Sequence, residues 1–175
     1  MHLTDILPIA DWMKLEGEIS EKFGIAANVF DINGIRITNF KNWVNRLCPV
    51  VKANEKGQSF ICAVAHMNIA AQAMKNKKPV TEECDAGLVK PVVPIFVGDE
   101  FLGAICGCGL LLEGGEIDAF LIHKITDIPE AQIETLSENI KTITPDQVDA
   151  LTQFMQQKID KIIKDYGNKT TGKAL

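Results

Sequence analysis

Five cysteines are the residues of this 175-residue chain whose types and spacing best suit chemistry. Cys48, Cys62 and Cys84 are widely and irregularly spaced, and Cys106 and Cys108 follow within a glycine-rich segment. The N-terminal residues lack the basic stretch and apolar run of a secretory leader, so we expect a cytoplasmic protein. Thiols in a reducing compartment typically hold a metal, a redox group or a small ligand and do not form a disulfide framework.

One candidate site combines sulfur with imidazole. Cys62 lies four residues before His66, which puts both side chains on one face of a predicted helix. With Cys48 and Cys84 they would supply four donors from three elements, a tentative metal set suited to zinc, an iron–sulfur cluster or haem. The alternative is that these cysteines are buried apolar side chains and His66 a surface or core histidine, because the short Cys-x-x-Cys spacings of structural zinc sites are absent.

A second candidate site is the strand that carries the last two cysteines. Cys106 and Cys108 share one of its faces, while the opposite face carries Gly103, Gly107 and Gly109. Glycines inside a strand mark either the close approach of a ligand or tight packing against a neighbouring element, and the pattern favours neither. The predicted ligand-binding residues are Cys48, Cys62, Cys84, Cys106, Gly107, Cys108 and Gly109.

Composition and missing motifs exclude several classes of function. A net charge of −5 with scattered lysines argues against direct nucleic-acid binding, which depends on clustered basic residues. No apolar run reaches the roughly 20 residues of a membrane helix, so we expect no membrane contact. Phosphate-loop, dinucleotide and hydrolase motifs are absent, and no pair of carboxylates suggests acid–base catalysis.

The hydrophobic pattern predicts the elements that would position these residues. Apolar residues at three- and four-residue intervals indicate a helix over 9–23 that Gly24 ends. A hairpin is predicted from 25–30 and 35–38 around Asn33-Gly34. The other predictions are two short helical pieces around Pro49 within 43–53, a helix over 59–76 buried through Phe60, Ala63, Met67, Ala70 and Met74, strands over 80–84, 88–97 and 100–112, and a helix over 129–140. Residues 118–123 fit a helix or a strand.

A long helix is predicted to begin at Pro145 and to reach about Tyr166. Its apolar stripe is long for a helix that only caps the domain, so we predict an output element and a homodimer contact. The alternative, packing of the stripe on the domain's own sheet, is favoured for its first two turns. The stripe consists of Val148, Leu151, Met155, Ile159 and Ile162. The composition, 46% hydrophobic and 23% charged, predicts one α+β domain over 1–166, with a central antiparallel sheet covered by helices, and a flexible tail over 167–175.

Several short motifs together resemble the PocR sensory domain family over about Leu3 to Leu112 and the C-terminal helix. The motifs are Leu47-Cys48, Gly57 with Cys62 five residues later, Cys84-Asp85-Ala86-Gly87-Leu88, Pro94-Ile95 and Leu102-Gly103-Ala104 through Gly107. The resemblance implies a divergent PAS-like or GAF-like fold and a role in prokaryotic signal transduction. It implies sensing of small molecules, such as simple hydrocarbon derivatives, and not catalysis.

The chain departs from the family pattern in two ways. Family members commonly have a histidine after the third cysteine and an aspartate near the position of His66, so Asp85 and His66 could alter an inherited ligand or metal arrangement. The family domain is usually joined to a DNA-binding, kinase or nucleotide-cyclase module, and none follows Tyr166, so we expect a separate or deleted output module.

The leading hypothesis is a sensor with a small-molecule pocket lined by Cys48, Cys62, Cys84 and the strand Gly107–Gly109. A thiolate-ligated metal, iron–sulfur or haem sensor of redox state or gas stays open as an alternative. So does a structural module that dimerises through its last helix.

Overall fold

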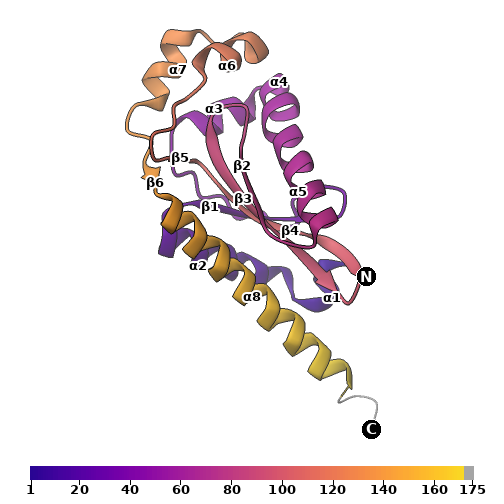
Figure 1. Ribbon diagram of the computed structural model, residues 1–175. Helices are drawn as coiled ribbons and strands as arrows, with labels where there is room; N and C mark the ends of the chain where they lie inside the picture. Colours follow the sequence, from indigo (N-terminus) through magenta and orange to yellow (C-terminus); the bar gives the residue numbers. More distant parts are fainter. Residues whose placement is uncertain (172–175) are drawn as a thin grey trace.

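A six-stranded sheet with helices on both faces forms the centre of the computed structural model, which describes residues 1–171 (Figure 1). The helices are α1 (Leu3–Ile6), α2 (Ile9–Phe23), α3 (Leu47–Ala53), α4 (Glu55–Gly57), the π-helix η1 (Gln58–Ala63), α5 (Val64–Asn76), α6 (Ala119–Thr126), α7 (Glu130–Ser137) and α8 (Pro145–Thr171). The strands are β1 (Ala26–Asp31), β2 (Val80–Glu83), β3 (Leu88–Val97), β4 (Glu100–Cys108), β5 (Leu110–Leu112) and β6 (Thr142–Ile143). The chain therefore has the predicted α+β class.

Strand β4 lies between β1 and β3 and is antiparallel to both. Its Cys106 is opposite Asn28 of β1 and Val92 of β3. Because Val92 also pairs with Val80, β2 occupies the other side of β3. Beyond Gly109, β5 pairs with β3 in antiparallel orientation and with β6 in parallel orientation. The sheet is therefore mixed, whereas the prediction was an antiparallel sheet.

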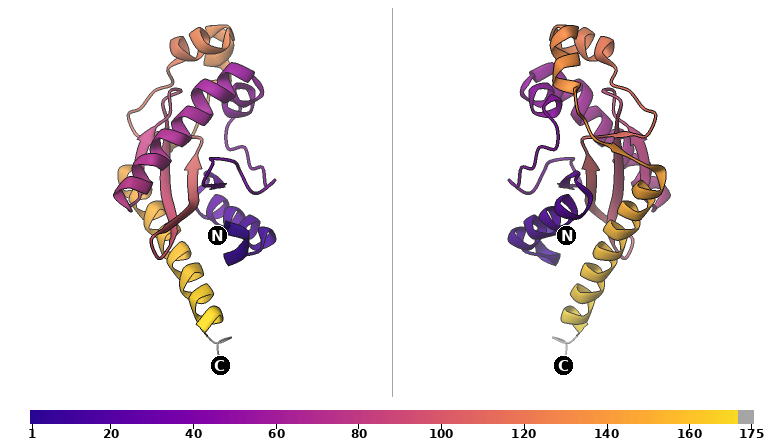
Figure 2. Two further views of the ribbon diagram at one scale, coloured as in Figure 1. Left: turned by 90° about the vertical axis from the view of Figure 1, so that its right-hand side faces the viewer. Right: turned by 90° about the vertical axis from the view of Figure 1, so that its left-hand side faces the viewer.

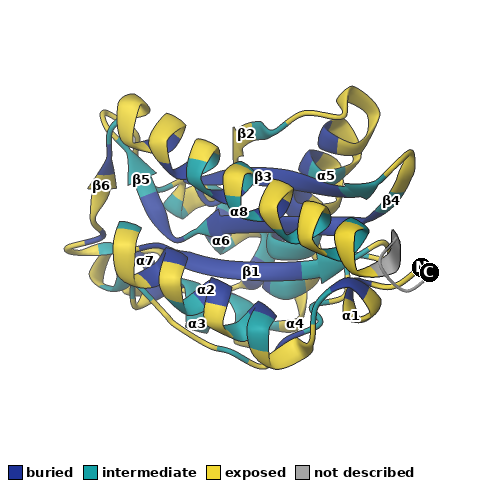
Figure 3. Cartoon of the chain, turned by 90° about the horizontal axis from the view of Figure 1, so that it is seen from below, coloured by how far each residue is buried: buried dark blue, intermediate teal, exposed yellow. Residues whose placement is uncertain are grey.

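Successive side chains of the central strands enter different layers, because a strand alternates its side chains between two faces. Val93 and Ile105 belong to the largest buried cluster, which also holds residues of α2 and α8. Val92 and Cys106 face the other way and pack with Ile69 of α5. Figure 2 shows α5 in front of the strands in one view and α8 in front of them in the opposite view. Figure 3 shows β1, β3 and β4 largely buried behind α2 and α8.

A third cluster joins α3, α6 and α7 at the end of the molecule that is uppermost in Figure 1. Leu47, Ile122 and Ile133 are fully buried in it. Cys48, Cys62 and Cys84 pack against the same cluster and are partly buried. Helix α6 begins after Asp118, whose side chain accepts a hydrogen bond from the backbone N–H of Leu121 at 2.8 Å, so the segment that fitted helix or strand is helical.

The prediction for α2 is confirmed from first to last residue, with Gly24 in the left-handed conformation (φ 64°) as its C-cap. Strand β3 is confirmed with its predicted bounds. The last helix also begins at Pro145 as predicted, but it continues past Tyr166 to Thr171. Part of the predicted tail is therefore helical, and its residues 172–175 lie outside the described residues.

The predicted hairpin after β1 is wrong in its second half. Phe30 and Arg36 form only an isolated bridge. The Asp31 carboxylate accepts hydrogen bonds from the N–H groups of Asn33 and Ile35, both at 2.9 Å, and closes the turn. Two backbone hydrogen bonds flank this bridge, from Asp31 to the Ile35 carbonyl at 2.9 Å and from Ile37 to the Val29 carbonyl at 3.1 Å. The chain does not continue as a strand, and Thr38 instead donates a hydrogen bond to Glu16.

Two helix predictions are also corrected. Pro49 lies in the first turn of α3, where no amide donor is required, so residues 47–53 form one helix and not two pieces. In the helix over 59–76, Phe60 and Met67 are each 59% exposed, and the residues facing the sheet include Ile69 and Ala73. Both sides of this helix carry apolar residues, so its pattern alone did not decide which side packs.

Candidate ligand-binding site

A cavity of about 110 Å³ lies between the sheet and the helices α3, η1 and α5. Residues of β1, β3 and β4 form its floor: Ala26, Asn28, Phe30, Leu88, Lys90 and Cys108. Residues from the covering helices and the end of β2 form its walls: Cys48, Lys52, Gln58, Cys62, Ala63, His66 and Cys84. The segment between β1 and α3 supplies the remaining lining residues, Gly34, Arg36, Lys41, Asn42 and Trp43. Trp43 is 43% exposed, which places this segment at the rim.

Four of the predicted cysteines, Cys48, Cys62, Cys84 and Cys108, line this one cavity although they come from four different elements. Cys106 does not line it and is fully buried between the sheet and α5. All five cysteines are free thiols. Cys62 and His66 both line the cavity.

Asn45 fixes the position of Cys48. Its side-chain oxygen accepts a hydrogen bond from the N–H of Cys48 at 2.8 Å, and its amide nitrogen donates to the Cys48 sulfur at 3.3 Å. The same nitrogen donates to the carbonyl of Gly109 at 2.7 Å. Asn45 therefore ties the start of α3 to the break between β4 and β5.

Cys84 is held by the turn between β2 and β3. Its N–H donates to the Leu88 carbonyl at 2.9 Å, and its carbonyl accepts from Gly87 at 2.8 Å. Gly87 has φ 85°, and a Cβ there would lie 2.1 Å from the Glu116 carbonyl oxygen. Only glycine fits this position, which gives a physical reason for the Cys-x-Ala-Gly-Leu motif.

Gly107 of β4 and Gly109, which directly follows β4, do not leave open space on their bare sides. A Cβ at Gly107 would lie 2.7 Å from Cδ1 of Ile25, in the cluster on the other face of the sheet. A Cβ at Gly109 would lie 2.6 Å from the side chain of Val44. At both positions, therefore, the neighbours are protein side chains, which agrees with the packing alternative.

Burial makes the cavity thiols weak acids. It raises the pKa of Cys48 to about 12, with a further contribution from Cys108, and the pKa of Cys62 to about 11. Burial also raises the pKa of Cys84, against the effect of hydrogen bonds from Ala86 and Leu88. These thiols are therefore protonated at neutral pH and are poor nucleophiles.

The predicted metal set of Cys48, Cys62, His66 and Cys84 gains no support. Within residues 1–171, no three histidine, cysteine, aspartate or glutamate side chains are grouped so that they could share a metal ion. The four residues lie on one cavity wall without the arrangement of a ligand shell.

His66 is stacked on Phe30, with ring centroids 3.8 Å apart and an angle of 28° between the rings. The histidine is 3% exposed. Burial lowers its pKa to about 3, and the positive charges of Lys90 and Lys52 act in the same direction. His66 is therefore neutral at physiological pH, as an uncharged hydrogen-bonding group of the cavity.

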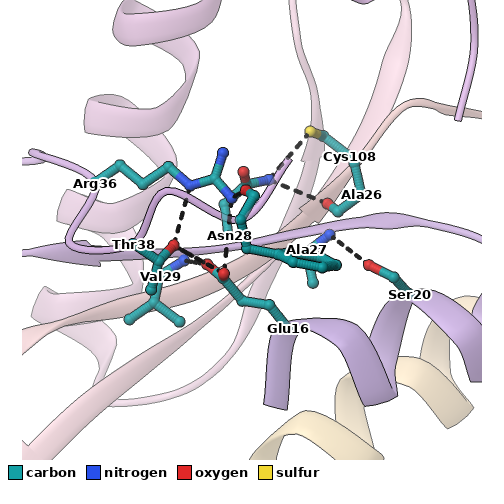
Figure 4. Close-up of polar contacts among 10 residues, drawn as sticks. Glu16, Ser20, Ala26, Ala27, Asn28, Val29, Arg36, Thr38 and Cys108 are labelled. Carbon is teal, nitrogen blue, oxygen red and sulfur yellow. Dashed lines mark hydrogen bonds and ion pairs between the residues drawn. The ribbon is translucent and has the colours of Figure 1, made fainter. Parts of the chain in front are cut away.

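The rim of the cavity is connected to α2 through a buried carboxylate (Figure 4). The Glu16 side chain is fully buried, accepts hydrogen bonds from Thr38 at 2.7 Å and from the N–H of Val29 at 2.8 Å, and lies 3.7 Å from the guanidinium of Arg36. Burial raises the pKa of Glu16, and these three partners oppose the rise. Figure 4 also shows Asn28 between the Ala26 carbonyl and the Cys108 sulfur.

Several lining residues escaped the sequence analysis, namely Asn28, Arg36, Gln58, Trp43 and Lys90. For Lys90 a signal existed, because it is the only charged residue within the apolar stretch 88–97. A lone charge inside a buried strand usually has a partner or a function. Gln58 and Arg36 gave no such signal, since polar residues in a loop or at a helix start are common.

A helix-covered sheet with an internal, partly polar cavity defines a ligand-binding class of domain. The family model described as the sensory domain found in PocR matches residues 5–166, and the chain belongs to this family. Comparison with curated proteins and with solved structures found no significant match. Within the described residues, no helix combines the length and apolar character needed to cross a membrane.

Proposed function

We propose that the domain binds a small organic molecule in the cavity lined by Cys48, Cys62, Cys84 and Cys108, and that it reports occupancy to an output partner through α8. Membership of the PocR sensory domain family supports a ligand-sensing role in signal transduction and suggests a non-catalytic one. The family resemblance favours a simple hydrocarbon derivative.

Two unsatisfied polar atoms carry this proposal. Among the described residues, the buried side-chain oxygen or nitrogen atoms without a hydrogen-bond partner are Oε1 of Gln58 and Nδ1 of His66, and both residues line the cavity. Buried polar groups are normally paired, because leaving one unpaired costs about 1–3 kcal/mol. A bound molecule with hydrogen-bonding groups would satisfy both atoms.

The route from the cavity to α8 runs through the contact between Arg36 and Glu16. Arg36 lines the cavity, whereas Glu16 belongs to α2, which packs on α8. A ligand that moves the rim segment would therefore change the environment of a buried carboxylate on α2. Contacts of α2 with α8 would carry the change to the last helix.

A cavity-filling variant tests the site. Ala63 lines the cavity, so Ala63→Leu should occupy ligand space, while Ala71→Leu places the same change on the exposed side of α5. Thermal melts and NMR titrations with a panel of C2–C4 alcohols, diols, aldehydes and carboxylates should find binders to the natural sequence and to Ala71→Leu. Ala63→Leu should remain folded and bind none of them. Equal binding by both variants, or no binder to the natural sequence, would refute the proposal.

A further inference from the structure

The charges around the cavity define a ligand class, and this inference rests on the proposed function. We propose that the cavity binds a short-chain hydroxycarboxylate, whose carboxylate pairs with Lys90 and whose hydroxyl bonds to Gln58 and His66. Neither the family match nor the cysteine pattern indicates an anion.

The lining of the cavity is positively charged in an acidic chain. Arg36, Lys41, Lys52 and Lys90 line it, and no described aspartate or glutamate does so, although the net charge of the chain is −5. Arg36 has Glu16 as a partner, and Lys41 is exposed to solvent. Lys52 is partly exposed, and its ammonium lies 5.9 Å from the centroid of the Trp43 ring. The charge that lacks both a carboxylate and solvent is that of Lys90.

Lys90 is 7% exposed, and no described carboxylate lies within ion-pair distance of its ammonium group. Its neighbours include the Cys106 sulfur and the face of Phe30, whose ring centroid is 6.0 Å away. A buried ammonium without a counter-charge is strongly unfavourable. An anion in the cavity would supply the missing partner.

The cysteine sulfurs could provide the counter-charge for Lys90 in place of a bound anion only if they were ionised. Burial lowers the pKa of Lys90. The negative charge of ionised cysteine sulfurs, above all those of Cys106 and Cys108, has the opposite and larger effect, so that the net pKa of Lys90 is raised. Burial raises the pKa of Cys106 itself, so at neutral pH its sulfur is mainly a neutral thiol. A ligand carboxylate, in contrast, is ionised throughout the physiological range.

The two unpaired atoms, Oε1 of Gln58 and Nδ1 of His66, indicate that the ligand carries a hydroxyl group in addition to its carboxylate. Oε1 of Gln58 accepts hydrogen bonds, and an ionised carboxylate has no donor to offer it. A hydroxyl can donate its one hydrogen to Oε1 of Gln58 and at the same time accept a hydrogen bond from His66, in the tautomer of the neutral ring that carries its proton on Nδ1. One small molecule that carries both groups therefore satisfies three buried side chains.

The size of the cavity limits the carbon chain. Its volume of about 110 Å³ is below the roughly 150 Å³ of a cavity that holds one benzene molecule. Glycolate and lactate, with five and six non-hydrogen atoms, are of this scale, and Ala26, Ala63 and Leu88 provide an apolar surface for a methyl group. Inorganic phosphate is an anion of similar size but has no such apolar part.

Matched probes test the inference on the full chain by calorimetry and NMR titration. Lactate and glycolate should bind at least about tenfold more tightly than lactamide and glycolamide, the neutral isosteres, because a charge-assisted hydrogen bond to a buried ammonium is lost. Propionate and acetate, which lack the hydroxyl, should also bind more weakly. Lys90→Met, which keeps the length of the apolar stem, should abolish the preference for lactate over lactamide. Lys75→Met, at an exposed position of α5 that does not line the cavity, should retain it.

The outcomes separate this inference from the proposed function. If a neutral compound binds in the cavity and the hydroxy acids do not, or if lactamide matches lactate, the carboxylate assignment is wrong while the sensor function stands. Binding of phosphate alone would contradict the hydroxy-acid assignment in the same way. If Lys90→Met does not fold, the comparison of lactate with lactamide on the natural sequence still decides. Absence of any binder would refute the proposed function itself.

Discussion

The guanidinium of Arg36 lies 3.7 Å from the carboxylate of Glu16, and this pair joins the cavity rim to the opposite layer of the domain. Arg36 also donates a hydrogen bond to the Phe40 carbonyl, which shapes the rim segment. Glu16 in turn accepts from Thr38 and Val29. One buried carboxylate therefore organises the segment that covers the cavity.

Replacing Glu16 should destabilise the domain and loosen its rim. Glu16→Gln removes the charge and one acceptor while Arg36 and Thr38 remain, so we expect a loss of about 1–3 kcal/mol in the free energy of unfolding. The exposed ion pair of Glu18 with Lys158, at 2.5 Å, provides the control, and Glu18→Gln should lose less than about 1 kcal/mol. Urea titrations measure both, and equal effects would contradict a structural role for Glu16.

His66 should make stability depend on pH. Its pKa is about 3 in the folded chain and 6.5 in the unfolded chain, so between these pH values His66 binds a proton in the unfolded chain but not in the folded chain. Stability is therefore lost as the pH falls from 6.5 towards 3, by roughly 1–2 kcal/mol at pH 5. Unfolding at pH 7 and pH 5 should show a smaller difference for His66→Gln than for the natural sequence. His2→Gln, at an exposed position, is the control and should behave like the natural sequence.

Gly57 should tolerate no side chain. A Cβ at this position would lie 2.3 Å from the carbonyl oxygen of Val51, where α3 meets α4. Gly57→Ala should therefore cost about 1–3 kcal/mol. It should also weaken ligand binding, because Cys48 lies on α3 and Cys62 lies on η1, which directly follows Gly57. At Gly167, in α8, a Cβ would meet no atom within 4 Å, so Gly167→Ala should stabilise the helix by about 0.5–1 kcal/mol. Thermal melts that fail to separate the two variants would contradict this packing.

The cavity thiols should react slowly. With pKa values of about 12 and about 11, Cys48 and Cys62 carry far less thiolate near pH 8 than an exposed cysteine. Alkylation by iodoacetamide, followed residue by residue by mass spectrometry, should be at least roughly 100-fold slower in the folded chain than in urea. Rapid alkylation of either residue in the folded chain would show that the cavity is open or its thiols ionised.

Dimerisation through the end of α8 stays a prediction. Val148, Leu151, Met155 and Ile159 are buried in the domain's own core, so the first turns behave as the packing alternative predicted. Ile163 is only half-buried, and it is the residue to change. Light scattering should show a dimer for the natural sequence and a folded monomer for Ile163→Gln. A monomeric natural sequence at high concentration would refute the contact.

Local sequence determined the elements whose signals are complete within a few residues. In α2, the regular spacing of apolar residues ends at a glycine that can adopt positive φ. The turn Gly98-Asp99 separates two strands that are recognisable by alternating or consecutive apolar residues. The cysteine spacing and the glycine motifs were likewise enough to indicate the family. The end of α2 and the turn at Gly98-Asp99 depend on contacts between residues that are neighbours in the chain.

Tertiary structure alone decided the site. The register that places Ala26 opposite Cys108, and the choice of Ile69 over Met67 as the sheet-facing side of α5, depend on strands and helices far apart in sequence. These long-range pairings place Lys90, Gln58 and His66 around one cavity. They also direct the bare side of Gly107 towards Ile25, in the hydrophobic cluster on the opposite face of the sheet. No local pattern contains this information, because burial and partners are properties of the packed layers and not of a single segment.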